Sequence, residues 1–450
     1  MKRPKSPSPL YAWYGDDFTG STDVLEALAL HNVQSVLFTR APDARALARF
    51  PACRAVGIAG ESRSRSPRWM SANLPKIFRT VRRLGAPVNH YKVCSTFDSS
   101  PQIGNIGRAM ELGRAVFRSG TVPVVVGAPR LGRAVIFGNL FAEADGAMVR
   151  IDRHPTMRLH PVTPMTEADL CLHLARQTKL RLGLVDMSAF AAGTAEEQWQ
   201  TLLNEGADGV VFDGCSDSML EETARLIWDR ATNHATAHAA HRATARPIFA
   251  VGSSGLTHGL LRHWRSLGLI GPARTLPHAS LVDRLLVLSG SCSPATAKQI
   301  RRARQMGFAA WPLHGPPPWT GTMTKALKSL NDGRSVVLYT ALGPQPTDKK
   351  HGKSFSSALG DLLRQLVLST GVRRVVIAGG DTATHSVKHL GLDALTFAAP
   401  LAAGVPLCRG HASSPLDGLE LALKGGQIGP PDFFAHVRDG GPRSSSRLRE

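Results

Sequence analysis

Short apolar runs alternate with amphipathic segments along most of the chain. The runs at residues 10–14, 54–59 and 122–126 are almost uniformly apolar, as expected for strands buried on both faces. The segments between them place apolar residues three and four positions apart, which is the period of a helix. Further runs of this kind occupy residues 33–38, 181–186, 208–213, 247–251, 284–289, 335–340 and 373–378. This alternation predicts an α/β protein with mainly parallel sheets flanked by helices.

The stretch from His90 to Phe117 combines this pattern with polar chemistry. A short strand is followed by the polar cluster of residues 94–100 and then by a helical pattern. Ser99 or Ser100 is predicted to cap this helix, with Pro101 in its first turn. Ligands of open α/β sheets bind where strands end and helices begin, and helix N-termini attract anions. The stretch is therefore either an anion-binding edge or an ordinary capped turn.

Residues 231–246 separate two such series of strands and helices. This segment is rich in Ala, Thr and His and has almost no large apolar residue. Its histidines at helical spacing, His234, His238 and His241, are explained better by a solvated connector than by a metal site, because no carboxylate or cysteine matches them. We expect two domains with a cleft between them. The predicted parts are a disordered basic tail (1–9), an N-terminal domain (10–230), the connector (231–246), a C-terminal domain (247–437) and a flexible tail (438–450).

Composition narrows the class of protein. The chain has 450 residues, 43% of them hydrophobic, and no apolar run reaches the ~20 residues of a membrane span. The six cysteines form no C-x-x-C pair, and no signal-peptide pattern opens the chain, so a cytoplasmic protein is expected. The net charge of +20 is spread over the whole length, which makes nucleic-acid binding a secondary reading. A homo-oligomer stays open.

Glycine-rich turns follow several of the C-terminal strands. Residues 252–255, 290–293 and 379–382 each combine Gly with Ser, Thr or Asp before a helix. Glycine lets the backbone approach a ligand closely, and the N–H groups that follow can hold a phosphate. Neither G-x-x-x-x-G-K-[ST] nor G-x-G-x-x-G occurs, which disfavours P-loop and common dinucleotide enzymes. Three such turns in one half favour a nucleotide domain.

The N-terminal half carries charged groups at its strand ends. Asp16 and Asp17 directly follow the first strand, where they serve as a general base or Mg²⁺ ligands, or where one of them merely caps a helix. Arg63 and Lys92 follow other strands and suit a carboxylate or phosphate, although each taken singly is as well explained by a solvated surface charge. The Pro-rich segment 150–166 is predicted to be an ordered, functional loop.

Several motifs resemble one known family. Asp16-Asp17-Phe18-Thr19-Gly20 and the run from Lys92 to Pro101 are similar to the N-terminal signatures of the four-carbon acid sugar kinases, and residues 161–170 are similar to their central loop. Four stretches of the second half resemble the C-terminal ATP-binding loops of this family: Gly252–Leu256, Ser289–Ser291, Gly379–Thr382 and Lys424–Gly429. The last loop reads Lys-Gly-Gly-Gln-Ile-Gly, whereas the family more often has Lys-Ser-Gly-Asn-Phe-Gly.

The resemblance implies an N-terminal domain that binds a sugar acid and a C-terminal domain that binds ATP with Mg²⁺. We expect phosphorylation of a terminal hydroxyl of a tetronate or 3-oxo-tetronate, with Asp17, or alternatively Asp16, as the base. The expected substrate-binding residues are Arg63, Lys92, Ser95, Thr96 and Asp98. The expected ATP-binding residues are Ser253, Ser254, Gly255, Gly379, Gly380, Asp381, Thr382, Gly425 and Gly426. No residue is assigned as a metal ligand.

Three other readings stay open at this point. A sensor that binds sugar acid or nucleotide without chemistry would have no use for the acidic pair. A basic nucleic-acid-binding protein would show strongly salt-dependent binding. A sugar-acid dehydrogenase would need the dinucleotide fingerprint that the chain lacks.

Overall fold

The computed structural model describes residues 9–160, 162–232, 247–273, 276–343 and 353–441. Within them the chain forms two compact units. Unit 1 comprises Met1–Asp16, Ala27–Ser35 and Ala41–Ala273, and unit 2 comprises Asp17–Glu26, Val36–Arg40 and Arg274–Glu450. The tail predicted at 1–9 lies outside the described residues except for its last residue. So do most of the connector, with its three histidines, and most of the tail predicted at 438–450.

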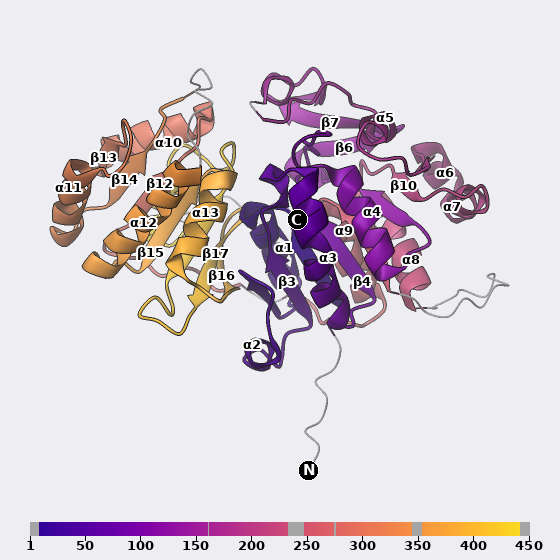
Figure 1. Cartoon of the computed structure of the whole chain (residues 1–450), viewed down its shortest axis with the longest axis horizontal. Helices are drawn as coiled ribbons and strands as arrows, with labels where there is room; N and C mark the ends of the chain where they lie inside the picture. Colours follow the sequence, from indigo (N-terminus) through magenta and orange to yellow (C-terminus); the bar gives the residue numbers. More distant parts are fainter. Residues whose placement is uncertain (1–8, 161, 233–246, 274–275, 344–352, 442–450) are drawn as a thin grey trace, which may run out of the picture. The chain divides into compact units, whose positions relative to one another are not determined.

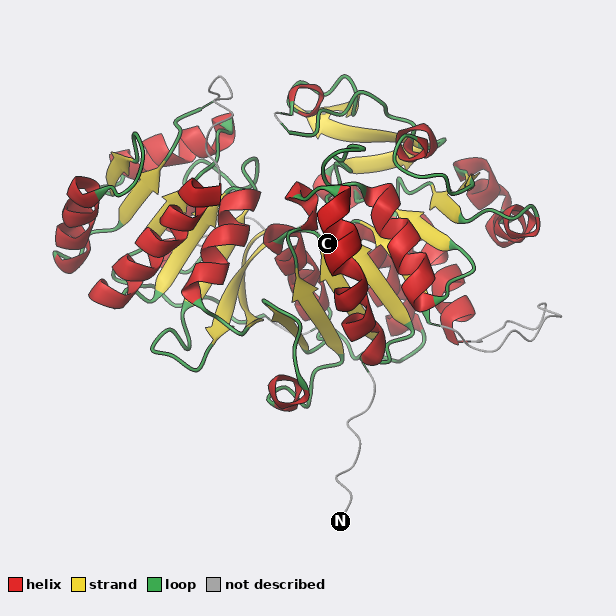
Figure 2. Ribbon diagram, in the orientation of Figure 1, coloured by secondary structure: helices red, strands yellow, loops and turns green. Residues whose placement is uncertain are grey.

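Unit 1 is built around a parallel sheet with helices on both faces (Figures 1 and 2). Its strands, in spatial order, are β3 (Ala55–Ala59), β1 (Tyr11–Gly15), β4 (Val88–Lys92), β11 (Ile248–Gly252), β5 (Val122–Val125), β10 (Gly209–Phe212) and β9 (Leu182–Val185). Its larger helices are α3 (Pro67–Arg83), α4 (Ile106–Phe117), α7 (Ala195–Asn204), α8 (Asp217–Thr232) and α9 (Ser254–Ser266). Short helices are α2 (Ala44–Ala48), α5 (Leu170–Ala175) and α6 (Met187–Ala192). The parallel, helix-flanked arrangement agrees with the predicted class.

Strand β11 lies in the middle of this sheet, between β4 and β5. Phe249 on β11 stacks on Phe117 of α4, with ring centroids 5.1 Å apart. The structure therefore differs from the domain boundary predicted within 231–246, because residues 247–273 belong to unit 1. The change in composition that suggested the boundary falls between α8 and β11, and both of these elements belong to unit 1.

A small antiparallel sheet was missed by the sequence reading. Its strands are β6 (Arg133–Ile136), β7 (Asn139–Ala144) and β8 (Ala147–Arg150). Asp213, which directly follows β10, anchors it by accepting hydrogen bonds from the backbone N–H groups of Phe137 and Gly138 at 2.6 and 2.8 Å. Because Asp213 sits at the end of β10, the small sheet lies at the carboxyl edge of the large one.

Helix α4 begins later than predicted. Its N-cap is Asn105, whose side chain accepts a hydrogen bond from Arg108 N, and not Ser99 or Ser100. Gly104 adopts a φ of +62° immediately before the cap, a backbone conformation that interrupts a helix. Ser100 instead closes a turn by accepting from Ile103 N. Pro101 therefore lies in a loop before the helix.

Unit 2 has a mixed sheet. Its strands, in spatial order, are β13 (Ala309–Pro312), β14 (Val336–Tyr339), β12 (Leu286–Ser289), β15 (Arg374–Ala378), β18 (Glu420–Lys424), β17 (Val405–His411), β16 (Ala394–Ala402) and β2 (Ser35–Phe38). The first five are parallel, whereas β17, β16 and β2 pair antiparallel. The helices are α10 (Pro294–Gln305), α11 (Thr320–Asn331), α12 (Lys353–Thr370), α13 (Gly380–Leu390) and α14 (Phe433–Asp439), together with the first part of α1 (Phe18–Leu30). No helix in the described part of the chain is long and apolar enough to cross a membrane.

Candidate functional site

The carboxyl ends of β1 and β4 form a switch point in unit 1. After β1 the chain reaches β3 on one side of it and β4 on the other, and such points are where open α/β sheets bind ligands. Asp16 follows β1, and its backbone joins the two ends: Asp16 N donates to Lys92 O at 2.9 Å, and Asp16 O accepts from Arg63 N at 3.1 Å. Three of the residues predicted from sequence therefore meet at this edge.

Arg63 and Thr96 each form direct hydrogen bonds to Asp98. Nη2 of Arg63 lies 2.9 Å from both carboxylate oxygens of Asp98, and the Thr96 hydroxyl donates to Oδ1 at 2.6 Å. Arg63 belongs to the short 3-10 turn after β3, and the other two belong to the loop after β4. Ser95 is buried on the same loop, and Lys92, also buried, donates through Nζ to the carbonyl of Val93 at 3.0 Å.

Asp98 is an ionised carboxylate in a buried position. Only 4% of the residue is exposed, and burial by itself would raise its pKa. The positive charge of Arg63, the nearby His160 and the Thr96 hydroxyl outweigh burial, so the pKa lies below its ordinary value. The site therefore keeps a fixed negative charge beside a guanidinium.

Two residues of this cluster were missed by the sequence reading. The Thr163 hydroxyl donates to Oδ2 of Asp98 at 3.1 Å, and Nδ1 of His160 lies 3.0 Å from the same hydroxyl. Both come from the Pro-rich segment predicted to be an ordered, functional loop. The signal for the loop was present, but nothing in the sequence showed which of its side chains turns inward.

A second group of side chains holds the loop after β4 in place. The Ser99 hydroxyl lies 2.8 Å from Nε2 of His173, and the Gln177 amide donates to Ser99 at 2.9 Å. The carbonyl of the same amide accepts from Ile106 N, at the start of α4, at 2.8 Å. Burial lowers the pKa of His173 to about 4, so the imidazole is neutral at pH 7. The group is a rigid support for the loop that carries Thr96 and Asp98.

Asp17, the preferred base, is placed at the start of α1. Its Oδ1 accepts a hydrogen bond from Gly20 N at 2.5 Å, which is the contact of an N-cap residue. Its other oxygen faces α13: a Cβ atom placed on Gly380 would lie 3.3 Å from Oδ2. Asp17 thus caps one helix and also lies against a predicted ATP-binding turn of the same unit.

A second switch point lies in unit 2, between the ends of β12 and β15. The chain goes from β12 to β13 and β14 on one side, and β15 lies on the other side of β12. Residues 290–293 follow β12, residues 379–382 follow β15, and Gly425 and Gly426 follow β18, which is next to β15. The predicted turns of this half therefore converge at one edge of the sheet.

At Gly290 and Gly426 these turns are packed so closely that an added side chain would have to displace a neighbouring group. A Cβ atom on Gly290 would lie 1.9 Å from Oγ1 of Thr382, and one on Gly426 would lie 2.6 Å from Oγ of Ser291. Gly379 has a φ of +111°, which side chains rarely adopt. The glycines bring three backbone segments together at the N-termini of α10 and α13, where N–H groups and the helix dipole favour an anion.

Lys424 carries a fully buried amine at this edge. Its Nζ donates to the carbonyl of Gly425 at 2.8 Å, to the carbonyl of Gly426 at 3.2 Å and to the hydroxyl of Thr296 at 3.1 Å. Burial lowers its pKa to about 7. Lys424 was part of the recognised Lys-Gly-Gly motif but was not among the predicted site residues. Its bonds tie the turn after β18 to α10.

Ser253, Ser254 and Gly255 belong to unit 1, whereas the other predicted ATP-binding residues belong to unit 2. Ser253 caps α9 by accepting from Gly255 N at 3.0 Å and donates to the carbonyl of Gly127 at 3.2 Å. A Cβ atom on Gly255 would lie 1.8 Å from that carbonyl oxygen. Close packing of α9 against the turn after β5 accounts for this motif within unit 1.

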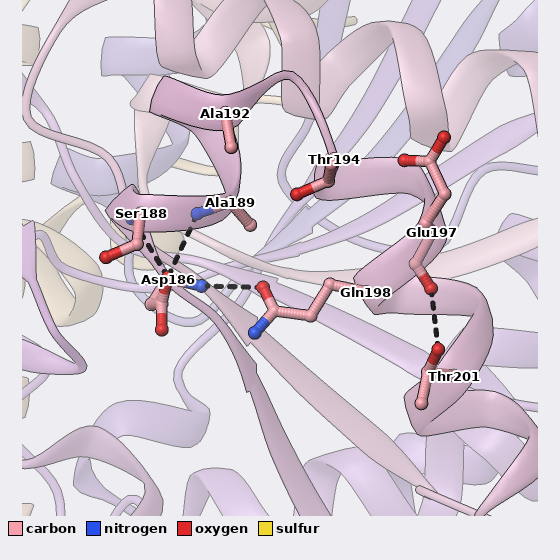
Figure 3. A pocket seen from close by; sticks show the side chains of 8 residues that line it. All are labelled: Asp186, Ser188, Ala189, Ala192, Thr194, Glu197, Gln198 and Thr201. Carbon is pink, nitrogen blue, oxygen red and sulfur yellow. Dashed lines mark hydrogen bonds between the residues drawn. The ribbon is translucent and has the colours of Figure 1, made fainter.

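A hollow on unit 1 lies between α6 and α7 (Figure 3). Asp186, Gln198 and Thr201 are among its lining residues. The Asp186 side chain caps α6 by accepting from Ser188 N and Ala189 N, and Asp186 N donates to Gln198. None of the residues predicted from sequence lines this hollow, and its polar groups serve local structure.

Among the described residues, no three His, Cys, Asp or Glu side chains are grouped so that they could hold a metal ion. A protein that meets Mg²⁺ through nucleotide phosphates needs only one or two carboxylates.

Comparison with known families covers both units. Residues 11–260 match a family model described as a sugar-binding N-terminal domain, and residues 286–434 match one described as a nucleotide-binding C-terminal domain. The boundaries of the first match include β11 and the first turns of α9, in agreement with the sheet of unit 1.

Individual relatives match over nearly the whole chain. A 3-oxo-isoapionate kinase of Paraburkholderia graminis is 42% identical, covering 96% of this chain and 94% of its own. A 3-oxo-tetronate kinase of Methylobacterium radiotolerans is 32% identical, covering 94% and 97%. Among solved structures, a Salmonella typhimurium LT2 protein described as a tRNA synthase has a TM-score of 0.73 at 23% identity, covering 94% and 98%. At that identity the structural likeness shows the fold alone.

Proposed function

Because the chain belongs to the four-carbon acid sugar kinase family, we propose that it transfers the terminal phosphoryl group of ATP to a hydroxyl of a four-carbon sugar acid. The observation that carries the proposal is the 42% identity to a sugar-acid kinase over 96% of the chain. The chain is accordingly a sugar acid kinase, with an alcohol group as phosphoryl acceptor.

The substrate proposed here is a 3-oxo sugar acid phosphorylated on a terminal hydroxyl. The names of the two relatives, 3-oxo-isoapionate kinase and 3-oxo-tetronate kinase, both describe 3-oxo acids. The higher identity to the first makes 3-oxo-isoapionate the first acid to test, ahead of the tetronates expected from the sequence. A small anion also suits the cations at the switch point of unit 1.

Roles for the residues of unit 1 follow from their positions. Arg63 and Lys92 supply positive charge for the substrate carboxylate, because both lie at the carboxyl edge of the sheet. The hydroxyls of Ser95 and Thr96 lie on the same loop and suit the substrate hydroxyls. Asp98 keeps Arg63 oriented through the two 2.9 Å contacts.

The turns of unit 2 are proposed to hold ATP. Residues 290–293 and 379–382 lead into the N-termini of α10 and α13, where backbone N–H groups suit phosphates. The pair Gly425-Gly426 follows β18 at the same edge of the sheet. Asp17 is proposed as the base that takes the proton of the attacking hydroxyl, with Asp16 as the alternative. Asp381, in the turn after β15, is the carboxylate that would hold Mg²⁺ together with ATP phosphates, and Mg²⁺ would neutralise charge developing on those phosphates.

The test is release of ADP from Mg-ATP with a panel of acids. The panel contains 3-oxo-isoapionate and the stereoisomers of erythronate, threonate and 3-oxo-tetronate. We expect turnover with at least one 3-oxo acid, and Asp17→Asn should abolish it while ATP binding, measured by calorimetry, is retained. Absence of ADP release with every acid would refute the proposed activity, and near-normal turnover of Asp17→Asn would remove Asp17 from the role of base.

A further inference from the structure

Asp98 accepts hydrogen bonds from three side chains, and one nitrogen of Arg63 faces both of its oxygens. Oδ1 accepts from Thr96 at 2.6 Å and from Arg63 at 2.9 Å. Oδ2 accepts from Arg63 at 2.9 Å and from Thr163 at 3.1 Å. An ionised carboxylate offers about four lone-pair positions and no donor. Both carboxylate oxygens of Asp98 are therefore engaged by protein groups, which suits a positioning role better than the direct contact with substrate expected from the sequence.

The bonds of Asp98 join three separate segments of unit 1. Arg63 comes from the turn after β3, Thr96 from the loop after β4, and Thr163 from the central loop, by which we mean residues 151–169 between β8 and α5. Thr163 is 2% exposed, and its backbone N–H also donates to Nδ1 of His160 at 3.1 Å. The carboxylate is the point at which the central loop is fastened to the sheet edge.

The backbone beside Asp98 is unusual in a way that supports this arrangement. Phe97, between Thr96 and Asp98, has a φ of +53°, a conformation that bulky residues rarely adopt. It is fully buried, and its ring lies 6.0 Å from that of His173. The kink at Phe97 accompanies the turning of Thr96 and Asp98 toward each other, and burial of the ring holds that kink in place.

We infer that Asp98 and Thr163 are positioning residues that fix the guanidinium of Arg63, and that Arg63 so held selects a carboxylate over an uncharged group in the substrate. The inference rests on the proposed function for the identity of the substrate as a sugar acid. An arginine held by a buried carboxylate is pre-oriented, so less conformational entropy is lost when it binds an anion. The central loop thereby takes part in selectivity through Thr163.

The test compares the acid that shows turnover with the corresponding polyol, in which a neutral CH₂OH group replaces the carboxylate. Thr163→Val removes the hydroxyl and keeps the shape of the side chain. We expect it to raise KM for the acid about 10-fold, as for loss of one hydrogen bond to a charged group, and to leave KM for ATP and for the polyol unchanged. Thr163→Ser should restore the low KM.

Thr166→Val is the matched control, because Thr166 lies on the same loop but is exposed. A double-mutant cycle shows whether Thr163 acts through Arg63. In the Arg63→Met background, Thr163→Val should add no further loss of discrimination between acid and polyol. Thermal unfolding of each variant shows whether it is folded. If Thr163→Val does not fold, the test uses Thr163→Ser in the wild-type and Arg63→Met backgrounds instead.

Three results would each overturn the inference. The first is that Thr163→Val raises KM equally for the acid and the polyol, and the second is that it raises KM for the acid no more than Thr166→Val does. The third is that the effects of Thr163→Val and Arg63→Met on the discrimination between acid and polyol are fully additive. Binding of the acid and of the polyol is also measured by calorimetry in the absence of ATP. This measurement tests the inference separately from the proposed kinase activity. An enzyme that binds the acid in preference to the polyol but releases no ADP would refute the kinase proposal alone, and binding without preference would refute the inference alone.

Discussion

Oδ2 of Asp17 faces Gly380, at a distance of 3.3 Å from the position of a Cβ atom on that glycine. Oδ1 of the same carboxylate is held at 2.5 Å by Gly20 N, so the group has little room to move away. Gly380→Ala should therefore displace the carboxylate by a few tenths of an ångström. We expect kcat to fall about 10-fold, because small misplacement of a reacting group is costly.

Gly321→Ala is the control for this prediction. Gly321 also lies in the first turn of a helix, α11, and among the described residues no atom beyond its own helix backbone and chain neighbours lies within 4 Å of a Cβ atom placed on it. The steady-state rate of ADP release should be unchanged in this variant. An unchanged kcat in Gly380→Ala would show that the contact with Asp17 has no part in turnover.

The buried amine of Lys424 should give the folding free energy a distinct pH dependence. Its pKa is lowered from the ordinary 10.5 to about 7 by burial. Between these values the unfolded chain binds the proton and the folded chain releases it, so this group makes stability rise with pH from about 7 to about 10. In Lys424→Met, the unfolding free energy from urea titrations should rise less over that range.

Lys325→Met, which replaces an exposed lysine of α11, should keep the wild-type slope. Only the slope of the unfolding free energy against pH is compared. Lys424→Met also loses the hydrogen bonds to Gly425, Gly426 and Thr296, so its unfolding free energy will differ from that of the wild type at every pH. Equal slopes in wild type and Lys424→Met between pH 7 and pH 10 would contradict the lowered pKa.

His173 is expected to contribute to acid sensitivity. Burial, reinforced by the charge of Arg176, lowers its pKa from the ordinary 6.5 to about 4. As the pH falls from 6.5 to 4 the unfolded chain gains a proton that the folded chain cannot accept, so stability is lost over that window. His173→Gln should lose less stability on acidification than wild type, whereas His314→Gln, at an exposed position, should lose as much.

The sequence was informative where local pattern decides structure. Uniformly apolar runs predicted β1, β3 and β15, because strands covered by helices on both faces have no polar side to show. The sequence was uninformative where the structure depends on contacts between segments that are far apart in the chain. The place of β11 between β4 and β5 depends on pairings across more than a hundred residues, and the composition of the preceding connector suggested a boundary instead.

The same distinction applies to the candidate site. Arg63, Thr96 and Asp98 were recognised because each follows a strand at one edge of a parallel sheet, and that edge is set by topology. Thr163 was not recognised, because a loop without regular structure gives no period from which the direction of a side chain follows. Asp98 was recognised as a site residue, but its hydrogen bonds to Arg63, Thr96 and Thr163 are visible only once these partners are in place.

The contact between Gly290 and Thr382 allows packing and nucleotide binding to be separated. A Cβ atom on Gly290 would lie 1.9 Å from Oγ1 of Thr382, so either the Thr382 side chain or one of the two turns would have to move. Gly290→Ala should lower the unfolding free energy by about 1–3 kcal/mol and weaken ADP binding, as measured by urea titration and calorimetry.

Thr382→Ala in the same background removes the colliding oxygen, and the nearest remaining atom of the residue is its Cβ at 3.1 Å. Stability should then recover most of what Gly290→Ala lost. Because the Thr382 hydroxyl is predicted to serve the nucleotide, ADP affinity should stay low in the double variant and fall in Thr382→Ala alone. Recovery of both properties would show that Thr382 limits packing only, and recovery of neither would show that the turn after β12 cannot carry a side chain for another reason.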